Sequence, residues 1–358
     1  MRLFLIGGFL GSGKTTAITT ASKMLMSQGR KVAVVTNDQG EQLVDNSFVE
    51  SFEIPTRAVS NGCFCCNYDQ LDVHIQALNE ENKPEFIFAE SVGSCTDLVA
   101  TIAKPLAKYR PEIDLVISVF ADATVLRSVL DGHQPFQEDV MYIYHKQLEE
   151  ADILVVNKVD LLSPDQLHNL KRSIKSQFPL KKLRFQNSTD ELKVREWLDQ
   201  VIAFEAPSFR HSLEIDYDIY AAGEANLAWF DKSIKIQSGE GKAIAIADKI
   251  IQGIHNAILG HALMIGHLKF FVESGQWKKK VSFTVGGRSM LAEWGYLKSN
   301  QVSMLINARV QTDPNTLKVL INDVLLTIES SESCTIEESK WASFKPGYPT
   351  PVHRITDS

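Results

Sequence analysis

Nearly uninterrupted apolar runs recur along the first part of the chain, up to about residue 200. Runs of this kind are typical of parallel β-strands that are covered on both faces, where no side of the strand meets water. The sequence therefore predicts buried strands in this region. They lie at residues 2–6, 32–36, 86–89, 115–120 and 153–156.

Amphipathic stretches lie between these runs, and residues 15–28 give the clearest pattern. Ile18, Ala21 and Leu25 share one face of a helix there, and Gly29 supplies a stop. Strand and helix alternating in this way predict an α/β fold, with a parallel sheet and helices on both of its faces.

The pattern changes after residues 204–211, where Pro207 interrupts it. Strands are expected at 212–236, 281–285 and 301–310, and helices at 244–272 and 315–327. Strands and helices without strict alternation predict a smaller α+β domain built on an antiparallel sheet. The predicted domains are therefore 1–205 and 206–330. Residues 331–358 hold three prolines and mixed charge, and we expect a loosely attached tail.

Composition narrows the class of protein. A length of 358 residues suits two domains. Apolar runs stay well below the roughly 20 residues of a membrane span, and the opening MRLFLIGG is interpreted as a first strand rather than a signal peptide. A net charge of −7 argues against a nucleic-acid partner. We therefore expect neither nucleic acid nor membrane as a partner, and a homo-oligomer stays open.

Residues 8–15, GFLGSGKT, fit the Walker A pattern in full, between a predicted strand and a predicted helix. Glycines let backbone N–H groups curl around phosphate oxygens, and the helix start adds its positive dipole end. Lys14 should reach the β- and γ-phosphates, and the Thr15 hydroxyl should bind Mg²⁺. The expected phosphate-binding residues are Gly8, Gly11, Ser12, Gly13, Lys14, Thr15 and Thr16.

The tetrapeptide Asn157-Lys158-Val159-Asp160 follows the predicted strand 153–156. Asp160 can accept hydrogen bonds from the guanine N1–H and 2-amino group, which adenine does not present. Asn157 can bind the O6/N7 edge, and the Lys158 stem can lie over the ring. The nucleotide is therefore predicted to be GTP or GDP, with a last base-contacting loop near residues 187–188. A helix-capping loop is the alternative.

Two acidic stretches are candidate switches. Glu90 ends the predicted strand 86–89, where a carboxylate beside a phosphate loop holds the Mg²⁺ shell or orders the attacking water. Gly93 can donate its backbone N–H to the γ-phosphate. Asp38 and Glu41 follow the strand 32–36 and can bind Mg²⁺ or a second metal, and a solvated acidic turn is the alternative. Lys14, Thr15, Glu90 and Gly93 form the predicted catalytic set.

Residues 62–66, GCFCC, place three of the five cysteines within four positions. With no secretory signal, an odd and clustered set indicates metal-binding thiols in a reducing cytoplasm rather than disulfides. Cys63, Cys65 and Cys66 suit a soft or borderline cation such as Zn²⁺, and three ligands leave a fourth position open for transfer. Cys95 is a further candidate ligand. A redox pair or an inert loop is the alternative.

These ordered motifs resemble the CobW-like family of P-loop GTPase metallochaperones over about residues 1–200. The resemblance implies that GTP hydrolysis with Mg²⁺ drives delivery of a metal, most often Zn²⁺ and in some branches Co²⁺, to a metal-requiring client protein. It also implies that Cys63, Cys65 and Cys66 bind the metal and that Asp38 and Glu41 couple it to the nucleotide. Gln147 falls where the family has a similar residue.

The chain departs from the family pattern at two of these motifs. It has TNDQGE where the family usually has ENEFGE, and ESVG where the family usually has ETTG. We expect slow intrinsic hydrolysis, with Gln39 as a candidate for orienting water. A GTPase that gates insertion of a corrinoid-type cofactor, a small-molecule kinase and a zinc reservoir are the alternatives.

Three histidines fall in the predicted helix 244–272, namely His255, His261 and His267. Their six-residue spacing turns each by about 240° from the last, so they do not share a face. We interpret them as structural, with His261 in an apolar stripe.

Overall fold

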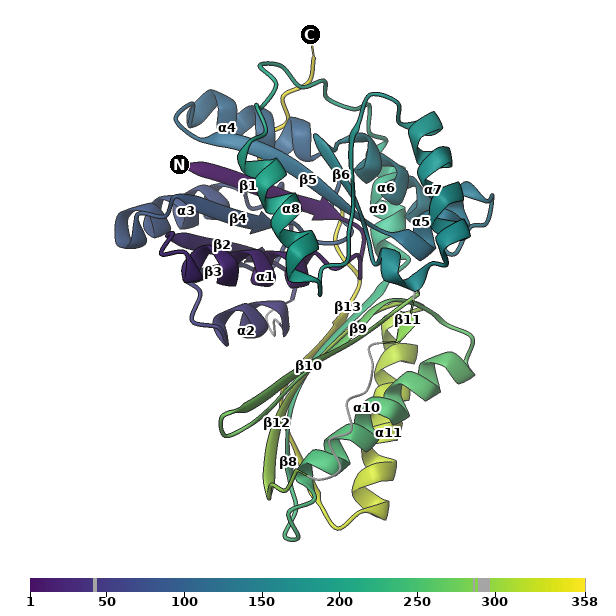
Figure 1. Cartoon of the computed structure of the whole chain (residues 1–358). Helices are drawn as coiled ribbons and strands as arrows, with labels where there is room; N and C mark the ends of the chain where they lie inside the picture. Colours follow the sequence, from purple (N-terminus) through teal and green to yellow (C-terminus); the bar gives the residue numbers. More distant parts are fainter. Residues whose placement is uncertain (41–43, 286, 289–296, 358) are drawn as a thin grey trace. The chain divides into compact units, whose positions relative to one another are not determined.

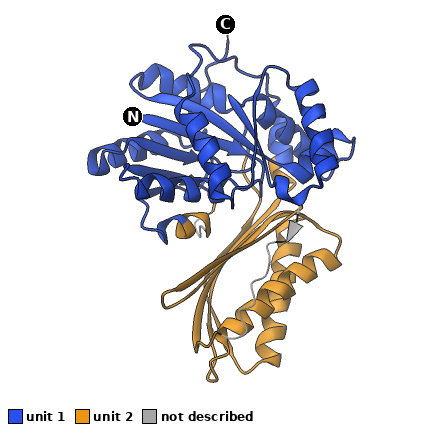
Figure 2. Cartoon of the chain, in the orientation of Figure 1, with its two compact units in different colours: residues 1–39, 49–223, 348–358 blue, residues 40–48, 224–347 orange. Residues whose placement is uncertain are grey.

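The computed structural model of the chain describes residues 1–40, 44–285, 287–288 and 297–357. These residues form two compact units (Figure 2). Unit 1 comprises residues 1–39, 49–223 and 348–358, and unit 2 comprises residues 40–48 and 224–347. The chain thus passes between the units four times. Residues 40–48, near the N-terminus, belong to unit 2, and residues 348–358, at the C-terminal end, belong to unit 1.

Unit 1 contains a parallel sheet that is seven-stranded within the described residues. This confirms the predicted α/β architecture, and all five predicted apolar runs are strands. In sheet order the strands are β3 (Thr56–Val59), β2 (Val32–Asn37), β4 (Phe86–Glu90), β1 (Arg2–Gly8), β5 (Asp114–Asp122), β6 (Ile153–Asn157) and β7 (Lys182–Phe185).

Helices cover both faces of this sheet (Figure 1). Alternate residues of β1 point to opposite faces, so Phe4 packs with α1 and Trp197 of α8, while Leu5 is buried on the other side. The helices and short helical turns, in chain order, are α1 (Lys14–Ser27), α2 (Val44–Glu50), α3 (Tyr68–Asn82), η1 (Val99–Ala103), α4 (Lys104–Tyr109), α5 (Ala123–Leu130), α6 (Glu138–Glu149), η2 (Val159–Leu161), α7 (Pro164–Gln177), α8 (Glu191–Ile202) and α9 (Tyr217–Ala225).

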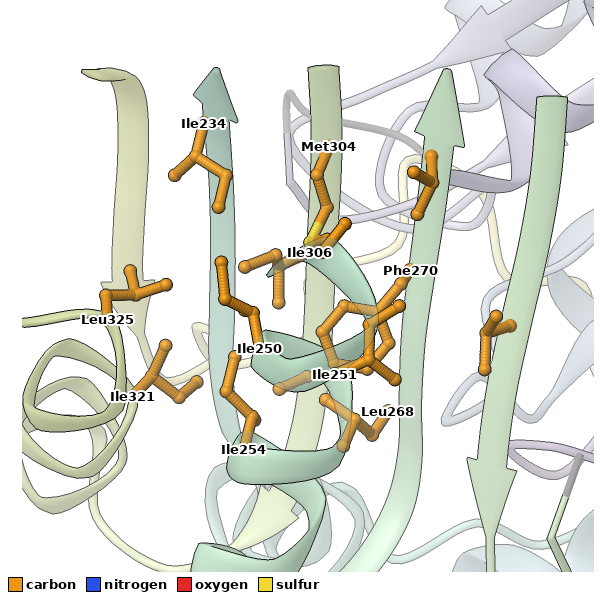
Figure 3. Packing of buried hydrophobic residues seen from close by; sticks show 14 of the residues in the cluster. Ile234, Ile250, Ile251, Ile254, Leu268, Phe270, Met304, Ile306, Ile321 and Leu325 are labelled. Atoms are coloured by element: carbon orange, nitrogen blue, oxygen red, sulfur yellow. The ribbon is translucent and has the colours of Figure 1, made fainter. Parts of the chain in front are cut away.

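Unit 2 is built on an antiparallel sheet, as the sequence predicted. In sheet order its described strands are β11 (Gly287–Arg288), β10 (Trp277–Thr284), β9 (Met264–Ser274), β12 (Gln301–Gln311), β8 (Ala228–Gln237) and β13 (Thr335–Phe344). Two helices, α10 (Ala243–Gly260) and α11 (Pro314–Ser331), pack on one face. Figure 3 shows Ile250 and Ile254 of α10 and Ile321 of α11 against Phe270 and Ile306 of the sheet.

The prediction of one helix over residues 244–272 is wrong. Helix α10 ends at Gly260, the backbone turns at Ala262 with a φ of 53°, and β9 begins at Met264. The prediction failed because the apolar positions of the sequence keep helical spacing across this turn. Ile265 and Leu268 fall by chance where the apolar face of a longer helix would continue. The aromatic and β-branched stretch around Phe270 is typical of a strand instead. Residues 212–236, predicted as strand, likewise include α9.

The prediction of a loose tail from residue 331 is also wrong. Residues Thr335–Phe344 form β13, which pairs with β8 at the edge of the unit 2 sheet. Residues 348–358 then return to unit 1, where Arg354 Nε donates a 2.7 Å hydrogen bond to the buried Asp97. Proline content and mixed charge indicated solvent exposure, but this segment pairs with β8 and bonds Asp97, which both precede it by about 100 residues or more along the chain.

Residues 40–48, which follow the candidate switch after β2, pack within unit 2. The Val44 N–H donates to Asn307 Oδ1 at 2.9 Å, and Asp45 forms ion pairs with Lys269 and Lys280 at 2.5 and 2.6 Å. Those two lysines hold the pKa of Asp45 well below its usual range, against the opposing effect of burial. Val44 and Asp45 are therefore held in unit 2 by a hydrogen bond from the backbone to a side chain and by ion pairs.

Over the described part of the chain, every helix is too short or too polar to cross a membrane.

The buried ion pair between Arg309 and Asp231 should be a stability determinant of unit 2. Both side chains are at most 1% exposed, and the atoms lie 2.6 Å apart. Replacing Asp231 with Ala leaves the guanidinium buried without its charge partner, so we expect a loss of about 3–5 kcal/mol in the free energy of unfolding. Denaturant titration of the purified chain measures this loss.

The exposed pair Arg57–Glu81 supplies the control for that measurement. Its side chains are 40% and 53% exposed, so Glu81→Ala should cost less than about 1 kcal/mol. Equal, small losses for the two variants would contradict the assignment.

Candidate functional site

The functional motifs meet at the carboxyl edge of the parallel sheet. Strand β1 lies between β4 and β5, with Ile6 opposite Glu90, and Asp122 at the end of β5 lies opposite Asn157 at the end of β6. Because parallel strands end at one edge, this register brings together loops that are separated by up to 150 residues in the chain. The edge is the usual position of a ligand site in an open α/β sheet.

The phosphate loop joins β1 to α1, and its glycines are required by its backbone. Gly8 has a φ of 123°, and a Cβ there would lie 2.1 Å from the Phe120 carbonyl oxygen. Gly13 has a φ of 92° and immediately precedes α1. A glycine-rich loop that leads into the start of α1 can present its backbone N–H groups to an anion, and this is the arrangement expected of a phosphate site.

Lys14 is buried and folds back over this loop. Its Nζ donates to the Gly8 carbonyl at 2.6 Å and to the Phe9 carbonyl at 3.2 Å. The ammonium is therefore positioned at the mouth of the loop, where a phosphate oxygen would meet it.

Thr15 and Glu90 meet in the site, as their predicted shared role requires. The Thr15 hydroxyl donates to Glu90 Oε1 at 2.9 Å, and both side chains are buried. One hydroxyl and one carboxylate side by side offer oxygen ligands of the kind that Mg²⁺ prefers. The pair can hold a hydrated Mg²⁺ next to the phosphate loop.

Asn157 connects two loops around the candidate base site. Its Nδ2 donates to the Ser12 carbonyl at 2.7 Å, and its Oδ1 accepts from both the N–H and the hydroxyl of Ser188 at 2.9 Å. The phosphate loop is tight here, since a Cβ at Gly13 would lie 2.2 Å from Asn157 Nδ2. Sequence reasoning gave Asn157 a base contact, and it missed this bracing role.

The other residues of the base tetrapeptide face the same region. Lys158 has a φ of 62°, and its ammonium lies 2.8 Å from Asp122, whose carboxylate also caps α5. Asp160 is exposed at the start of η2. The carboxylate that is predicted to bind guanine is therefore accessible to a base, while the lysine stem is fixed by an ion pair.

The cysteine loop is attached to the end of β2 through Asn37. The Asn37 side chain donates to the Gly62 carbonyl at 2.7 Å and to the Val59 carbonyl at 3.1 Å, and it accepts from the Phe64 N–H at 2.8 Å. Gly62 has a φ of 148°, and a Cβ there would lie 2.4 Å from Asn67 Nδ2. Any other residue at this position would be strained by the positive φ and would have to displace the Asn67 side chain.

Three thiols converge in this loop. The Sγ atoms of Cys63, Cys65 and Cys66 lie within 4.8 Å of one another, with 3.4 Å between Cys63 and Cys66 and 3.8 Å between Cys65 and Cys66. All are free of disulfide bonds. The pKa of Cys66 is raised to about 11, and the pKa of Cys65 lies well above its usual range. Hydrogen bonding with Cys63 is the main cause of both shifts. A thiophilic cation binding here must therefore displace protons.

The loop after β4 contacts both the phosphate loop and the cysteines. A Cβ at Gly93 would lie 3.0 Å from the Leu10 Cα, so this glycine lies directly against the phosphate loop. Gln147 of α6 donates from Nε2 to the carbonyls of Gly93 and Cys95, at 3.0 and 2.8 Å. Only the family resemblance pointed to Gln147, because its partners are backbone atoms that sequence spacing does not reveal.

The C-terminal segment also contacts the cysteine loop. The Val352 N–H donates to the Cys65 carbonyl at 2.9 Å, and the Ile355 N–H donates to the Ala100 carbonyl at 2.9 Å. His353 packs against the rings of Tyr68 and Tyr109. The cysteine loop is therefore bonded both by the C-terminal segment and by Asn37.

Of the remaining candidates, Asp38 donates its N–H to the Val59 carbonyl at 3.2 Å, and Glu41 lies outside the described residues. The histidines belong to unit 2 and to different elements. His255 of α10 stacks on Phe283 with ring centroids 4.0 Å apart, His261 follows α10, and His267 is buried in β9. The structure does not bring these three together as a metal site.

Glu150 should make the stability of unit 1 depend on pH. Burial raises the pKa of Glu150 to about 8, although it accepts hydrogen bonds from the Val99 N–H and the Thr96 hydroxyl. In the unfolded chain it titrates at its usual value, so the folded state holds the extra proton between the two pKa values. The free energy of unfolding should therefore fall by about 3 kcal/mol as the pH rises from about 5.5 to about 8. Burial also raises the pKa of the neighbouring Asp97, and this shift lowers the free energy of unfolding in the same direction.

Replacing Glu150 with Gln should remove most of this dependence, as measured by denaturant unfolding of reduced, metal-free protein at both pH values. Glu149→Gln is the matched control, since that side chain is 45% exposed. A slope that Glu150→Gln leaves unchanged would show that the carboxyl is ionised in the folded protein.

Several known proteins are similar in sequence to this chain. Zinc chaperone CobW of a Sinorhizobium species is 26% identical over 195 residues, covering 48% of this chain and 54% of the relative. Zinc chaperone YeiR of Escherichia coli is 32% identical over 178 residues, covering 48% and 50%. Zinc-regulated GTPase metalloprotein activator 1 of Dictyostelium discoideum is 27% identical over 224 residues, covering 53% and 46%. The chain spans about half the length of the curated relatives it matches.

Among solved structures, HypB from Helicobacter pylori in complex with nickel has a TM-score of 0.42 and 16% identity, covering 56% of this chain and 85% of that one. HypB from Archaeoglobus fulgidus has a TM-score of 0.41 and 20% identity, covering 56% and 89%.

The family described as CobW/HypB/UreG, nucleotide-binding domain, matches residues 2–184. This match takes in the phosphate loop, the cysteine loop, Glu90 and the base tetrapeptide, and it extends over just more than half of the chain. The protein therefore belongs to the CobW/HypB/UreG family.

Proposed function

We propose that this chain is a GTP-hydrolysing metallochaperone, which binds a thiophilic divalent cation, Zn²⁺ first, on Cys63, Cys65 and Cys66 and delivers it to a client protein. The observation that carries the proposal is the attachment of the thiol cluster to a nucleotide site. Asn37, at the end of β2, makes three hydrogen bonds to the β3 end and the cysteine loop.

Three convergent thiols support the choice of cargo. Sulfur ligands favour zinc and other soft or borderline cations over magnesium or calcium. Three protein ligands also leave one tetrahedral position for a client's own ligand, which suits transfer better than storage. Co²⁺ accepts the same ligands and is the natural spectroscopic substitute. Relatives named zinc chaperones agree with zinc as the first candidate.

The contacts in the site support the following nucleotide roles. Lys14 neutralises the β- and γ-phosphates, and the main-chain N–H groups around Gly13 bind their oxygens. Thr15 and Glu90 hold Mg²⁺, which supplies charge neutralisation at the phosphates when bound. Asp160 selects guanine, and Gly93 contacts the γ-phosphate through its N–H. Glu90 or Gln39 orients the attacking water, and intrinsic hydrolysis is slow.

Binding of GTP orders the loops after β2 and β4, and loss of the γ-phosphate releases them. Asn37 and Gln147 are the residues that pass this change on, since each bonds a nucleotide-side loop to the cysteine side. Metal affinity should therefore depend on which guanine nucleotide is bound. The coupling is reciprocal, so the metal should change GTP affinity by the same factor.

Replacement of Cys65 with Ala tests the cargo site. Anaerobic titration of the wild-type chain with Co²⁺ should show uptake of about one ion per chain with thiolate-to-metal charge-transfer absorption. Cys65→Ala should weaken binding by at least about 100-fold, because one of three ligands is lost and the rest of the loop is unchanged.

Cys334→Ser is the matched control, since Cys334 is a free cysteine of unit 2, whereas the cluster belongs to unit 1. It should bind Co²⁺ as the wild type does. Equal Co²⁺ affinity for wild type and Cys65→Ala, or an affinity that GTP and GDP leave identical, would overturn the proposal.

Replacement of Asp160 with Asn tests guanine selection. The amide can no longer accept from N1–H and the 2-amino group, so GTP affinity should fall by about 100-fold or more. Xanthine carries an oxygen at position 2, to which the new amide can donate, so XTP should bind the variant better than GTP does. Equilibrium binding of labelled GTP and XTP to both proteins is the measurement. Unchanged GTP affinity would place the base elsewhere.

A further inference from the structure

A fourth cysteine lies against the thiol cluster from a different part of the sequence. Cys95 is fully buried in the loop after β4, and its Sγ lies 4.0 Å from the Cys65 Sγ. Thirty residues separate the two cysteines in the chain. The tertiary fold, rather than local spacing, therefore brings this sulfur to the cluster.

The sulfur separations suit a tetrahedral site. Four sulfurs at about 2.3 Å from one Zn²⁺ lie about 3.8 Å from each other. The separations found are 3.4 Å for Cys63–Cys66, 3.8 Å for Cys65–Cys66 and 4.0 Å for Cys65–Cys95. These three of the six edges differ from the ideal edge by a few tenths of an ångström. Cys95 does not lie within 4.8 Å of all three other sulfurs, so closure of the site requires a rotation about its side-chain bond or a shift of its loop toward the cluster.

We propose that Cys95 is the fourth ligand of the metal site, closing the three-thiolate cluster into an all-sulfur tetrahedral site for a borderline divalent cation such as Zn²⁺. This inference rests on the proposed function. It adds to the three-sulfur site, which we call open, a four-sulfur state of the same site, which we call closed. Each thiol that joins the cation releases its proton to solvent, so a closed site releases one proton more than an open one.

The position of Cys95 ties the closed state to the nucleotide. Two residues before it, Gly93 lies against the phosphate loop at Leu10. Gln147 holds the carbonyls of Gly93 and Cys95 with one side-chain amide, at 3.0 and 2.8 Å. A shift of Gly93 toward or away from a γ-phosphate therefore moves Cys95 with it.

The cation is held by four sulfurs when the loop is in place, and by three when the loop withdraws. An all-sulfur site is typical of stable retention, and a three-ligand site has the open position that a client ligand needs. Nucleotide turnover thus changes the number of ligands rather than the identity of the site. Cys95 is the residue that switches.

X-ray absorption spectroscopy of the Zn²⁺-loaded wild-type chain tests this without a mutation. We expect four sulfur neighbours at about 2.3 Å in one nucleotide state and three, with one lighter neighbour, in the other. The states compared are GDP and a non-hydrolysable GTP analogue with Mg²⁺. Three sulfurs in both states would overturn the assignment of Cys95, and four in both would overturn its role as a switch.

Cys95→Ser supplies the second measurement, because a hydroxyl nearly preserves the volume but replaces the thiolate. In the nucleotide state with four sulfurs, the Co²⁺ charge-transfer absorption should fall to about three quarters of the wild-type value, and affinity should weaken by at least about tenfold. Cys334→Ser should match the wild type. GTP binding by each variant verifies that the site is folded.

The outcomes separate the two proposals. If Cys65→Ala abolishes metal binding while Cys95→Ser binds Co²⁺ with wild-type absorption and affinity in both nucleotide states, the proposed function stands. Cys95 is then a buried thiol that packs as a small apolar residue, and the inference fails. If Cys65→Ala also binds as the wild type does, both proposals fail together.

Discussion

The site depends on the parallel pairing of β1 with β4. This register places Ile6 opposite Glu90, so the phosphate loop and the acidic loop leave the sheet side by side. The hydrogen bond between Thr15 and Glu90 is a direct result. The interiors of both strands are apolar and buried, and a slip of one residue would turn each of those side chains to the opposite face. The geometry of the site is therefore fixed by the core beneath it.

Neutral amides, more than charges, join the loops at this edge. Asn157 bonds the phosphate loop to the Ser188 loop, Asn37 bonds β3 and the cysteine loop, and Gln147 bonds two carbonyls of the loop after β4. An amide offers donors and an acceptor at once, and its burial costs far less than burial of a charge. Each of these side chains can therefore satisfy two or three buried polar groups without burying a further charge.

Two short segments belong to a different unit from the residues that precede them in the chain, namely residues 40–48 and residues 348–358. Residues 40–48 follow the candidate switch and belong to unit 2, where Val44 and Asp45 bond the sheet. Residues 348–358 belong to unit 1, where the Val352 N–H bonds the cysteine loop. Unit 2 is thus continuous in the chain with the candidate switch and with the segment that supports the thiols.

Local sequence determined the elements whose signals are themselves local. The phosphate loop, the buried strands, the base tetrapeptide and the thiol triplet each follow from residue type and short spacing, because backbone conformation and ligand chemistry act over a few residues. Tertiary structure alone decided the end of α10, the docking of residues 348–358, the bracing by Gln147 and the approach of Cys95 to Cys65. Those features rest on partners tens to hundreds of residues away, and only packing of the strands and helices brings such groups within bonding distance.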